Sequence, residues 1–293
     1  MRLDIEVVDA MKIAKNNLVT FLIACAVSTI ANGQNLISLM RHDGTMLSAM
    51  AYKPAGNECK GIAVISHGAG GSEQGYAYLG TGLSDLGYLA VVPRHKESGR
   101  LALQAKTNGK SIRDGLAALI TDAHAYQTRF MDIAAVKTWA QNVCESKESV
   151  LIGHSMGAAT VMMQAGARNN MNLALTASFG AYIAISPQGV GMIFPENAWS
   201  EIEQPVLMLT GTQDREIDGH SWETRTTPFK NMPSGCKWLG VIDGATHMNF
   251  AGNGFSKKTE TLTNLVIRDF LKAKKTGECQ TANQLTGMTL TVK

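Results

Sequence analysis

Apolar runs alternate with helical patterns over most of the chain after residue 36. Runs of mainly apolar and β-branched residues predict strands, and longer segments with apolar positions three or four residues apart predict helices. The predicted strands are 37–41, 46–52, 61–66, 88–92, 149–152, 181–186, 205–210 and 237–242. The predicted helices are 79–86, 127–143, 158–167 and 256–272.

This order predicts an α/β fold in one domain. Strands that alternate with helices favour a mostly parallel central sheet with helices on both faces. The first two strands differ, because they flank the turn His42-Asp43-Gly44-Thr45 and therefore form an antiparallel hairpin. We found no internal repeat and no sign of a second domain.

Three segments fall outside the alternation. Residues 96–122 are polar and irregular in pattern, which predicts a surface excursion. Residues 187–203 combine glycine, proline and aromatic residues, as in a lid or a pocket loop. Residues 274–293 are polar and rich in threonine, and we expect a tail whose one anchor is Cys279.

Composition supports a large folded core. The chain has 293 residues, of which 45% are apolar and 17% charged, so it can bury a core and is not a disordered chain. The net charge of +3 is small, and the basic residues form no cluster. Nucleic acid is therefore not an expected partner.

The N-terminus is typical of an export signal. Lys12 and Lys15 precede an apolar stretch over 18–30, and Ala31-Asn32-Gly33 offers small residues for cleavage. We expect a signal peptide over 1–33 and a mature domain over 34–293, exported to the periplasm or the medium. The apolar stretch is too short to favour a membrane span.

Two alternatives stay open in this region. Acidic residues among the first ten are unusual ahead of a signal peptide, and translation from Met11 would explain them. Leu22-Ile23-Ala24-Cys25 also resembles a lipoprotein box, in which Cys25 would carry the lipid anchor.

Export changes how the cysteines are interpreted. Without Cys25 four remain, an even number in an oxidising compartment, and no two of them have the spacing of zinc ligands. Structural disulfides are therefore expected and a metal site is not, although free buried thiols stay an alternative. The four are Cys59, Cys144, Cys236 and Cys279.

The strongest chemical signal is the segment Gly153-His154-Ser155-Met156-Gly157. It joins a predicted strand to a predicted helix, so Ser155 stands at the apex of a sharp turn. Small residues are needed at 153 and 157, because a side chain there would collide with the neighbouring strand or helix. The five-residue pattern alone is weak evidence, so the interpretation depends on the residues around it and on later strand ends.

Two further polar residues follow later strands. Asp214 comes after the strand 205–210 and His247 after the strand 237–242. Parallel sheets gather such residues at the carboxyl ends of their strands, so Ser155, Asp214 and His247 are expected to meet there. Asp218 is the nearest substitute for Asp214. His67 and His154 are interpreted as packing or hydrogen-bonding residues.

The order Ser155, Asp214, His247 around a glycine-flanked serine resembles the α/β-hydrolase fold over nearly the whole mature chain. The segment from Ser66 to Ser72, followed by Gly75-Tyr76 and Leu79, is most similar to the dienelactone hydrolase-like group, which includes platelet-activating-factor acetylhydrolases. Arg129-Phe130-Met131-Asp132-Ile133 adds to the resemblance. Arg94-His95 departs from it, because relatives often have an aspartate there, and this puts the substrate class in doubt.

The resemblance implies a serine hydrolase that cleaves carboxylic esters through an acyl-enzyme. Ser155 would be the nucleophile, His247 the general base and Asp214 the residue that orients the imidazole. The backbone amides of Ala69 and Met156 would form the oxyanion hole, each worth about 3 kcal/mol. An acyltransferase or peptidase on the same residues, or a binding protein that has kept the fold, are the alternatives.

The remaining expectations concern the ligands. Tyr76, Phe194, Trp199 and Trp222 are candidates for the substrate pocket, and each is equally typical of ordinary core. The expected partner is a small-molecule or lipid ester. No metal and no organic cofactor are expected, because hydrolysis needs only water. The sequence does not indicate an oligomeric state.

The resemblance also suggests which cysteines pair. In the usual strand order, the strand after Cys59 lies beside the strand after Cys144, at the edge of the sheet away from the chemistry. Cys236 precedes the last predicted strand and Cys279 follows the last helix, so this pair would hold the C-terminus.

Overall fold

The computed structural model describes residues 33–56, 58–174, 178–252, 254–280 and 282–293. The predicted signal peptide, the alternative start at Met11 and the alternative anchor at Cys25 lie outside these residues. Within the described part of the chain, no helix is long and apolar enough to cross a membrane. The residues from Gln34 onward form one compact unit.

A nine-stranded sheet runs through the described residues in the order β1-β2-β4-β3-β5-β6-β7-β8-β9. Strands β3 to β8 are parallel, whereas β1 and β2 at one edge and β9 at the other are antiparallel to their neighbours. The strands are β1 (Gln34–Met40), β2 (Met46–Tyr52), β3 (Gly61–Ser66), β4 (Tyr88–Pro93), β5 (Ser149–His154), β6 (Ala181–Ile185), β7 (Val206–Gln213), β8 (Lys237–Thr246) and β9 (Met288–Val292). The predicted mostly parallel sheet with an antiparallel start is confirmed.

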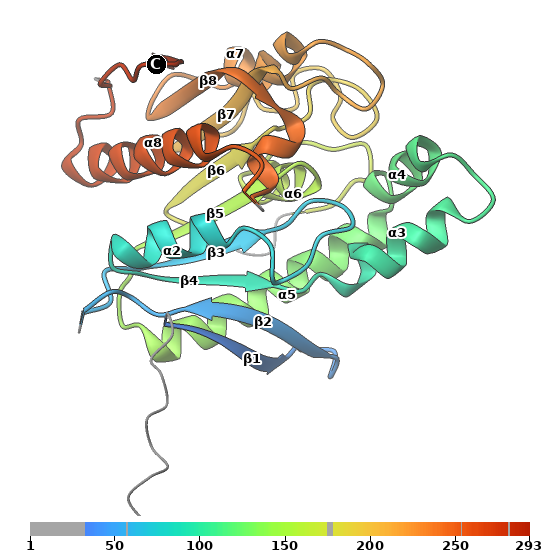
Figure 1. Cartoon of the computed structure of the whole chain (residues 1–293), viewed down its shortest axis with the longest axis horizontal. Helices are drawn as coiled ribbons and strands as arrows, with labels where there is room; N and C mark the ends of the chain where they lie inside the picture. Colours follow the sequence, from blue (N-terminus) through green and yellow to red (C-terminus); the bar gives the residue numbers. More distant parts are fainter. Residues whose placement is uncertain (1–32, 57, 175–177, 253, 281) are drawn as a thin grey trace, which may run out of the picture. The chain divides into compact units, whose positions relative to one another are not determined.

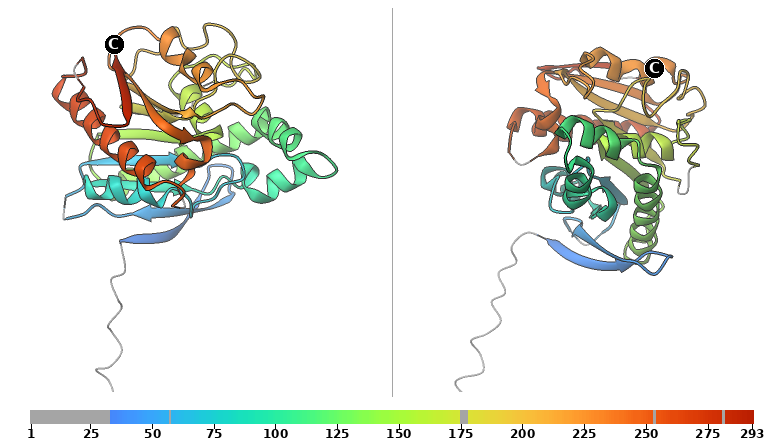
Figure 2. Two further views of the ribbon diagram at one scale, coloured as in Figure 1. Left: turned by 45° about the horizontal axis from the view of Figure 1, so that its top comes forward. Right: turned by 90° about the vertical axis from the view of Figure 1, so that its right-hand side faces the viewer.

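Helices cover both faces of the sheet (Figures 1 and 2). Helices α5 (Ala123–Val143) and α6 (Met156–Gln164) pack on one face, and α2 (Ala77–Asp85) and α8 (Lys257–Thr276) pack on the other. All six residues of β3 are buried, yet Val64 belongs to the first core and Ile65 to the second. The side chains of a strand alternate between faces, so one apolar run supplies both cores.

Both disulfides join the pairs that the resemblance suggested. Cys59 is bonded to Cys144 and Cys236 to Cys279. The first bond links the segments that enter β3 and β5, which are neighbours in the sheet. The second bond joins the residue directly before β8 to the segment after α8, so both bonds lie near the N-terminal ends of parallel strands.

The C-terminal segment is more than a tail with one anchor. Its last residues form β9, which pairs with β8 from Trp238↔Val292 to Ile242↔Met288. Met288 and Leu290 are buried against the α8 face, and they alternate with exposed threonines. This two-residue alternation predicts a strand, and the polar composition around it hid the signal.

Residues 96–122 are a second correction. The segment begins with a short 3₁₀ helix, η1 (Lys96–Ser98), and continues as α3 (Arg100–Thr107) and α4 (Ile112–Ile120). Figure 1 shows α3 and α4 at the end of the sheet toward which β4 points. The predicted irregular excursion is therefore a helical pair beside the carboxyl ends of the strands.

Candidate active site

Ser155 lies at the turn between β5 and α6 with φ 57° and ψ −120°, a conformation that few residues adopt. A Cβ atom on Gly153 would lie 2.2 Å from the Gly157 oxygen, and one on Gly157 would lie 2.0 Å from the Ser66 oxygen. Both positions therefore require glycine, for the reason that the sequence predicts. The turn holds the Ser155 hydroxyl above the carboxyl end of β5.

His247 and Asp214 complete a hydrogen-bonded line with Ser155. The Ser155 Oγ atom lies 2.9 Å from His247 Nε2, and His247 Nδ1 lies 2.8 Å from Asp214 Oδ1. Asp214 follows β7, and His247 begins the 3₁₀ helix η3 (His247–Ala251) directly after β8. We call Ser155, His247 and Asp214 the cavity triad.

Asp214 is fully buried and ionised. Burial by itself would raise the pKa of Asp214, but the hydrogen bond from His247 and the positive charge of Arg225 outweigh burial and hold this pKa below its usual value. The Arg225 Nε atom lies 2.9 Å from Asp214 Oδ1, and the Thr210 hydroxyl donates a 2.9 Å hydrogen bond to Oδ2. The carboxylate can therefore accept from His247 Nδ1–H, which leaves Nε2 free to accept a proton from Ser155.

The predicted oxyanion donors lie on two sides of Ser155. Ala69 is in the loop after β3 and lines the cavity, and Met156 is the first residue of α6. Within the described residues, neither the Ala69 N–H nor the Met156 N–H donates a hydrogen bond to the protein. Both donors are thus available to a ligand.

The cavity triad opens into a cavity of about 820 Å³, large enough for a small organic substrate. One wall is apolar and comes from the helices α3 and α4 through Leu103, Ile112, Leu116 and Ile120. Polar side chains line another part, including Gln188, Glu216 and Arg215.

Two of the predicted pocket residues lie elsewhere. Phe194 and Trp199 are fully buried, pack against each other with ring centres 5.3 Å apart and do not line the cavity. They belong to the core on the α6 face, together with Ile193 and Ile202. Tyr76 does line the cavity, but its hydroxyl is engaged within the protein. Trp222 packs against the core and is not among the lining residues.

The sequence reasoning missed the apolar wall and Arg225. The wall had a detectable signal, because Ile112, Leu116 and Ile120 recur every four residues after Ser111, whose side chain caps α4 by accepting from Asp114 N–H. Arg225 had none, since it is a single arginine in a polar segment. Its guanidinium donates to the backbone oxygens of Asp214, Arg215, Ser186 and Pro187.

A second serine, histidine and aspartate lie in line behind the loop after β3. The Ser66 Oγ atom lies 3.0 Å from His95 Nε2, and His95 Nδ1 lies 2.9 Å from Asp132 Oδ2. All three side chains are buried, and none lines the cavity. We call Ser66, His95 and Asp132 the buried triad.

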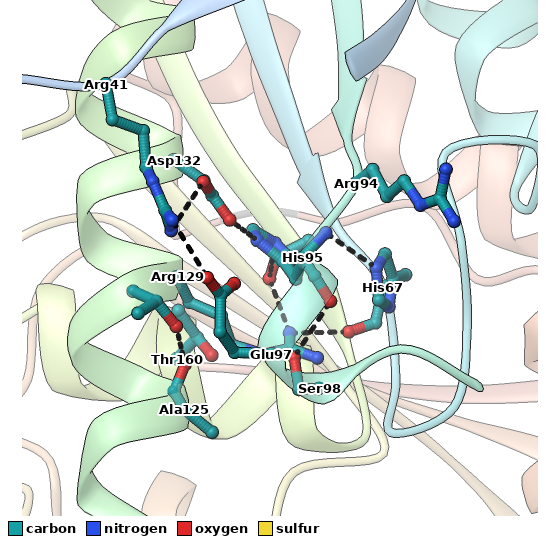
Figure 3. Close-up of polar contacts among 12 residues, drawn as sticks. Arg41, His67, Arg94, His95, Glu97, Ser98, Ala125, Arg129, Asp132 and Thr160 are labelled. Atoms are coloured by element: carbon teal, nitrogen blue, oxygen red, sulfur yellow. Dashed lines mark hydrogen bonds and ion pairs between the residues drawn. The ribbon is translucent and has the colours of Figure 1, made fainter. Parts of the chain in front are cut away.

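The buried triad belongs to a polar network that holds the loop after β3 (Figure 3). Arg129 donates to the Ser66 hydroxyl and to the His67 backbone oxygen, at 3.0 and 2.7 Å. His67 Nε2 accepts from the His95 N–H, so His67 Nδ1 carries the hydrogen that it donates to the Gly68 oxygen at 2.7 Å. This network fixes the backbone on both sides of His67, next to Ala69.

The described residues contain no group of three or more histidine, cysteine, aspartate or glutamate side chains that could hold a metal ion. The charged residues of the cavity wall are Arg100, Arg215, Glu216 and Arg225. The polar groups around Ser155 are those of acyl transfer, namely a hydroxyl, an imidazole and free backbone amides.

The chain matches a known protein family. The model of the dienelactone hydrolase family matches residues 47–248, which hold β2 to the start of η3 and all three residues of the cavity triad. None of the curated proteins matches the chain in sequence.

Several solved structures share the fold. An α/β serine hydrolase homologue from Coxiella burnetii is 17% identical and aligns over 80% of this chain and 95% of its own, with a TM-score of 0.55. Est1E from Butyrivibrio proteoclasticus is 16% identical over 82% of this chain and 99% of its own, with a TM-score of 0.56. The esterase Pf2001 from Pyrococcus furiosus is 16% identical over 82% and 91%, also with a TM-score of 0.56.

Proposed function

The chain belongs to the dienelactone hydrolase family, and on that premise we propose that it is a serine hydrolase that cleaves carboxylic esters through an acyl-enzyme intermediate. The observation that carries this proposal is the cavity triad at the mouth of an 820 Å³ cavity, with the Ser155 hydroxyl 2.9 Å from His247 Nε2. A serine needs such a base, because its hydroxyl is a weak nucleophile at its free pKa.

In the first half-reaction, the Ser155 oxygen attacks the ester carbonyl carbon and its proton passes to His247 Nε2. Asp214 holds the imidazole in the tautomer that accepts this proton and stabilises the resulting positive charge. The tetrahedral intermediate then collapses, the bond to the leaving oxygen breaks, and His247 returns the proton to the departing alcohol.

The negative charge of the intermediate needs donors that are already in place. The free amides of Ala69 and Met156 supply two, each worth about 3 kcal/mol of transition-state stabilisation. In the second half-reaction, water attacks the acyl-enzyme and gives up its proton to His247. The bond between the acyl carbon and the Ser155 oxygen then breaks, His247 returns the proton to this oxygen, and the carboxylic acid leaves.

The cavity suggests the class of ester. The wall of Leu103, Ile112, Leu116 and Ile120 favours an apolar acyl or alcohol group, and the volume suits a small molecule or one chain of a lipid ester. Activity over p-nitrophenyl esters of increasing acyl length tests this. Leu116→Ala should lower kcat/KM for the preferred acyl length by about tenfold, with Leu101→Ala on the exposed side of α3 as its control. Equal effects of the two would exclude this wall from acyl binding.

We also propose that residues 1–33 direct export and are removed. The disulfides Cys59–Cys144 and Cys236–Cys279 support an oxidising compartment. The length of the mature N-terminus, measured by mass spectrometry of the exported protein, tests cleavage after Gly33. A lipid-modified Cys25 at the N-terminus would favour the anchored form.

Labelling with a fluorophosphonate probe tests the enzyme itself. The reagent phosphonylates an activated serine, so the wild-type protein should be labelled at Ser155 and the Ser155→Ala variant should not. An unlabelled wild-type protein would refute the serine hydrolase and favour a binding protein. Added alcohol or amine during turnover separates hydrolysis from acyl transfer, because a transferase diverts the acyl group to the acceptor.

A further inference from the structure

Tyr76 and His154 form a buried hydrogen-bonded connection beneath Ser155. The Tyr76 hydroxyl lies 2.8 Å from His154 Nδ1 and accepts a 3.1 Å hydrogen bond from the Gly68 N–H. On the other side of the ring, His154 Nε2 lies 3.1 Å from the backbone oxygen of His247. The two residues border the cavity but are only 5% and 3% exposed.

The protons in this connection have one consistent arrangement. A backbone oxygen only accepts, so His154 Nε2 must carry the hydrogen that it donates to His247. Burial holds the pKa of His154 well below its usual value, so the ring is neutral and Nδ1 is an acceptor. The Tyr76 hydroxyl therefore donates to His154 and accepts from Gly68. Burial raises the pKa of this hydroxyl to about 12, so it keeps its proton.

The backbone around each residue directs its side chain into this connection. Tyr76 precedes α2 in the left-handed conformation, with φ 63°. A bulky residue seldom adopts this conformation, and such residues concentrate where the surroundings demand a particular side-chain direction. His154 is the last residue of β5, directly before the strained Ser155, and its ring lies 4.7 Å from the ring of His247.

The connection joins the three segments of the chain that carry the proposed reaction. Gly68 precedes Ala69, the proposed oxyanion donor; His154 precedes Ser155, the proposed nucleophile; and His247 is the proposed base. Asp214 holds the ring of His247 through Nδ1, whereas His154 holds its backbone. Rigid support of this kind matters, because an oxyanion donor acts only when it lies about 3 Å from the developing charge.

We propose that Tyr76 and His154 are positioning residues, which keep the Ala69 amide and the His247 imidazole in register around the Ser155 oxygen through the reaction. The proposal rests on the proposed ester hydrolysis. Neither residue is a proton donor or acceptor for the substrate. Both ring nitrogens of His154 and both functions of the Tyr76 hydroxyl are already engaged.

Tyr76→Phe removes the hydroxyl and keeps the ring. The change leaves the Gly68 N–H and His154 Nδ1 without their partner, and we expect kcat to fall about 10- to 100-fold while KM changes less than about threefold. The affinity for a boronic acid transition-state analogue should fall by a similar factor. Tyr126→Phe is the control, because the Tyr126 hydroxyl is equally buried and has no hydrogen-bond partner within the described residues.

His154→Gln tests the other half. A glutamine amide can take the place of Nε2 and donate to the His247 oxygen. Glutamine has no atom at the position of Nδ1, so the Tyr76 hydroxyl loses its acceptor. If the two residues act as one connection, Tyr76→Phe should lower kcat much less in the His154→Gln background than in the wild type. Multiplicative effects of the two changes would overturn the proposal.

A measurement independent of turnover is the ¹⁵N NMR signature of the His154 ring. The proposal expects the hydrogen on Nε2 and an unprotonated Nδ1 from pH 5 to 8, with a shift confined to Nδ1 in Tyr76→Phe. A hydrogen on Nδ1 in the wild-type protein would overturn it. So would a folded Tyr76→Phe enzyme with wild-type kcat. A wild-type protein without esterase activity or probe labelling would instead refute the proposed function.

Discussion

The cavity triad and the buried triad have nearly the same geometry and different surroundings. Serine to histidine measures 2.9 Å in the first and 3.0 Å in the second, and histidine to aspartate measures 2.8 and 2.9 Å. Only the first reaches the cavity, through Ser155 and His247, and only its serine has free backbone amides beside it. Hydrogen-bond distances therefore do not by themselves identify a nucleophile, because the oxygen must also reach a substrate.

The two triads also differ in how their serine is held. Ser155 stands on a strained turn at the end of β5, whereas Ser66 is the last residue of β3 and its oxygen accepts a hydrogen bond from Arg129. The Arg129 guanidinium is fully buried, and burial lowers its pKa to about 10, so it is still charged near neutral pH. The buried triad thus holds the loop that carries Ala69, and this loop lies beside the serine of the cavity triad.

The largest expected contrast comes from removing each serine. Ser155→Ala should lower kcat/KM at least about 10⁴-fold, because the proposed nucleophile is lost. Ser66→Ala should keep kcat/KM within about tenfold and lower the free energy of unfolding by about 1–3 kcal/mol, since it leaves buried donors and acceptors unpaired. Ester kinetics and urea unfolding of both variants measure this. If Ser66→Ala abolished activity in a folded protein, the two roles would have to be exchanged.

Replacing each aspartate is the next test. Asp214→Asn should lower kcat about 10⁴-fold, because the imidazole takes the wrong tautomer, and it should also lower the free energy of unfolding, because the buried Arg225 loses its partner charge. Asp132→Asn should keep kcat within about tenfold and lower the free energy of unfolding by about 1–3 kcal/mol, because the amide has one acceptor oxygen where Asp132 pairs with both Arg41 and His95. The value of kcat distinguishes the two variants, and thermal unfolding shows that both are folded. Similar activity losses in two folded variants would contradict the comparison.

The smallest effect is a dependence of stability on pH. Burial lowers the pKa of His67 to about 3 and those of His95 and His154 well below the usual 6.5. Below pH 6.5 the unfolded chain binds three protons that the folded chain does not, so stability falls as the pH falls. Burial raises the pKa of Asp132 to about 8, so Asp132 binds a proton in the folded chain at a higher pH than in the unfolded chain. This proton offsets one of the three histidine protons.

The unfolded chain therefore binds three protons minus one, that is two, more than the folded chain. This difference predicts that the free energy of unfolding falls by roughly 2.7 kcal/mol for each pH unit between about pH 5.5 and 4.5. Urea unfolding at several pH values measures the slope. His154→Gln should reduce the slope by the contribution of about one proton, because it removes one of the three buried histidines. A stability that is flat across this range would contradict the buried, neutral state of these histidines.

Much of this molecule could be predicted from its sequence. Hydrophobic periodicity is a local property, and it located each of the parallel strands and the helices that cover them. The glycines around Ser155 carried the signal of the sharp turn. Asp214 and His247 were predicted from their places after strands, since parallel strands end at one edge of a sheet.

The errors have two physical causes. Phe194 and Trp199 were expected at the pocket, but aromatic side chains serve a core and a cavity equally well, and only packing decides between them. The α3–α4 wall and β9 were missed because polar neighbours masked a short apolar period.

The sequence by itself determined the parallel strands, the helices that cover them, their order and the residues that follow each strand. Only the tertiary structure showed that a second histidine, His95, serves a second serine, Ser66, behind the cavity. His95 and His247 each lie within hydrogen-bond distance of a serine and an aspartate. Both sets join residues far apart in the chain, so only the packing of loops on the sheet edge leaves one serine facing a cavity and encloses the other.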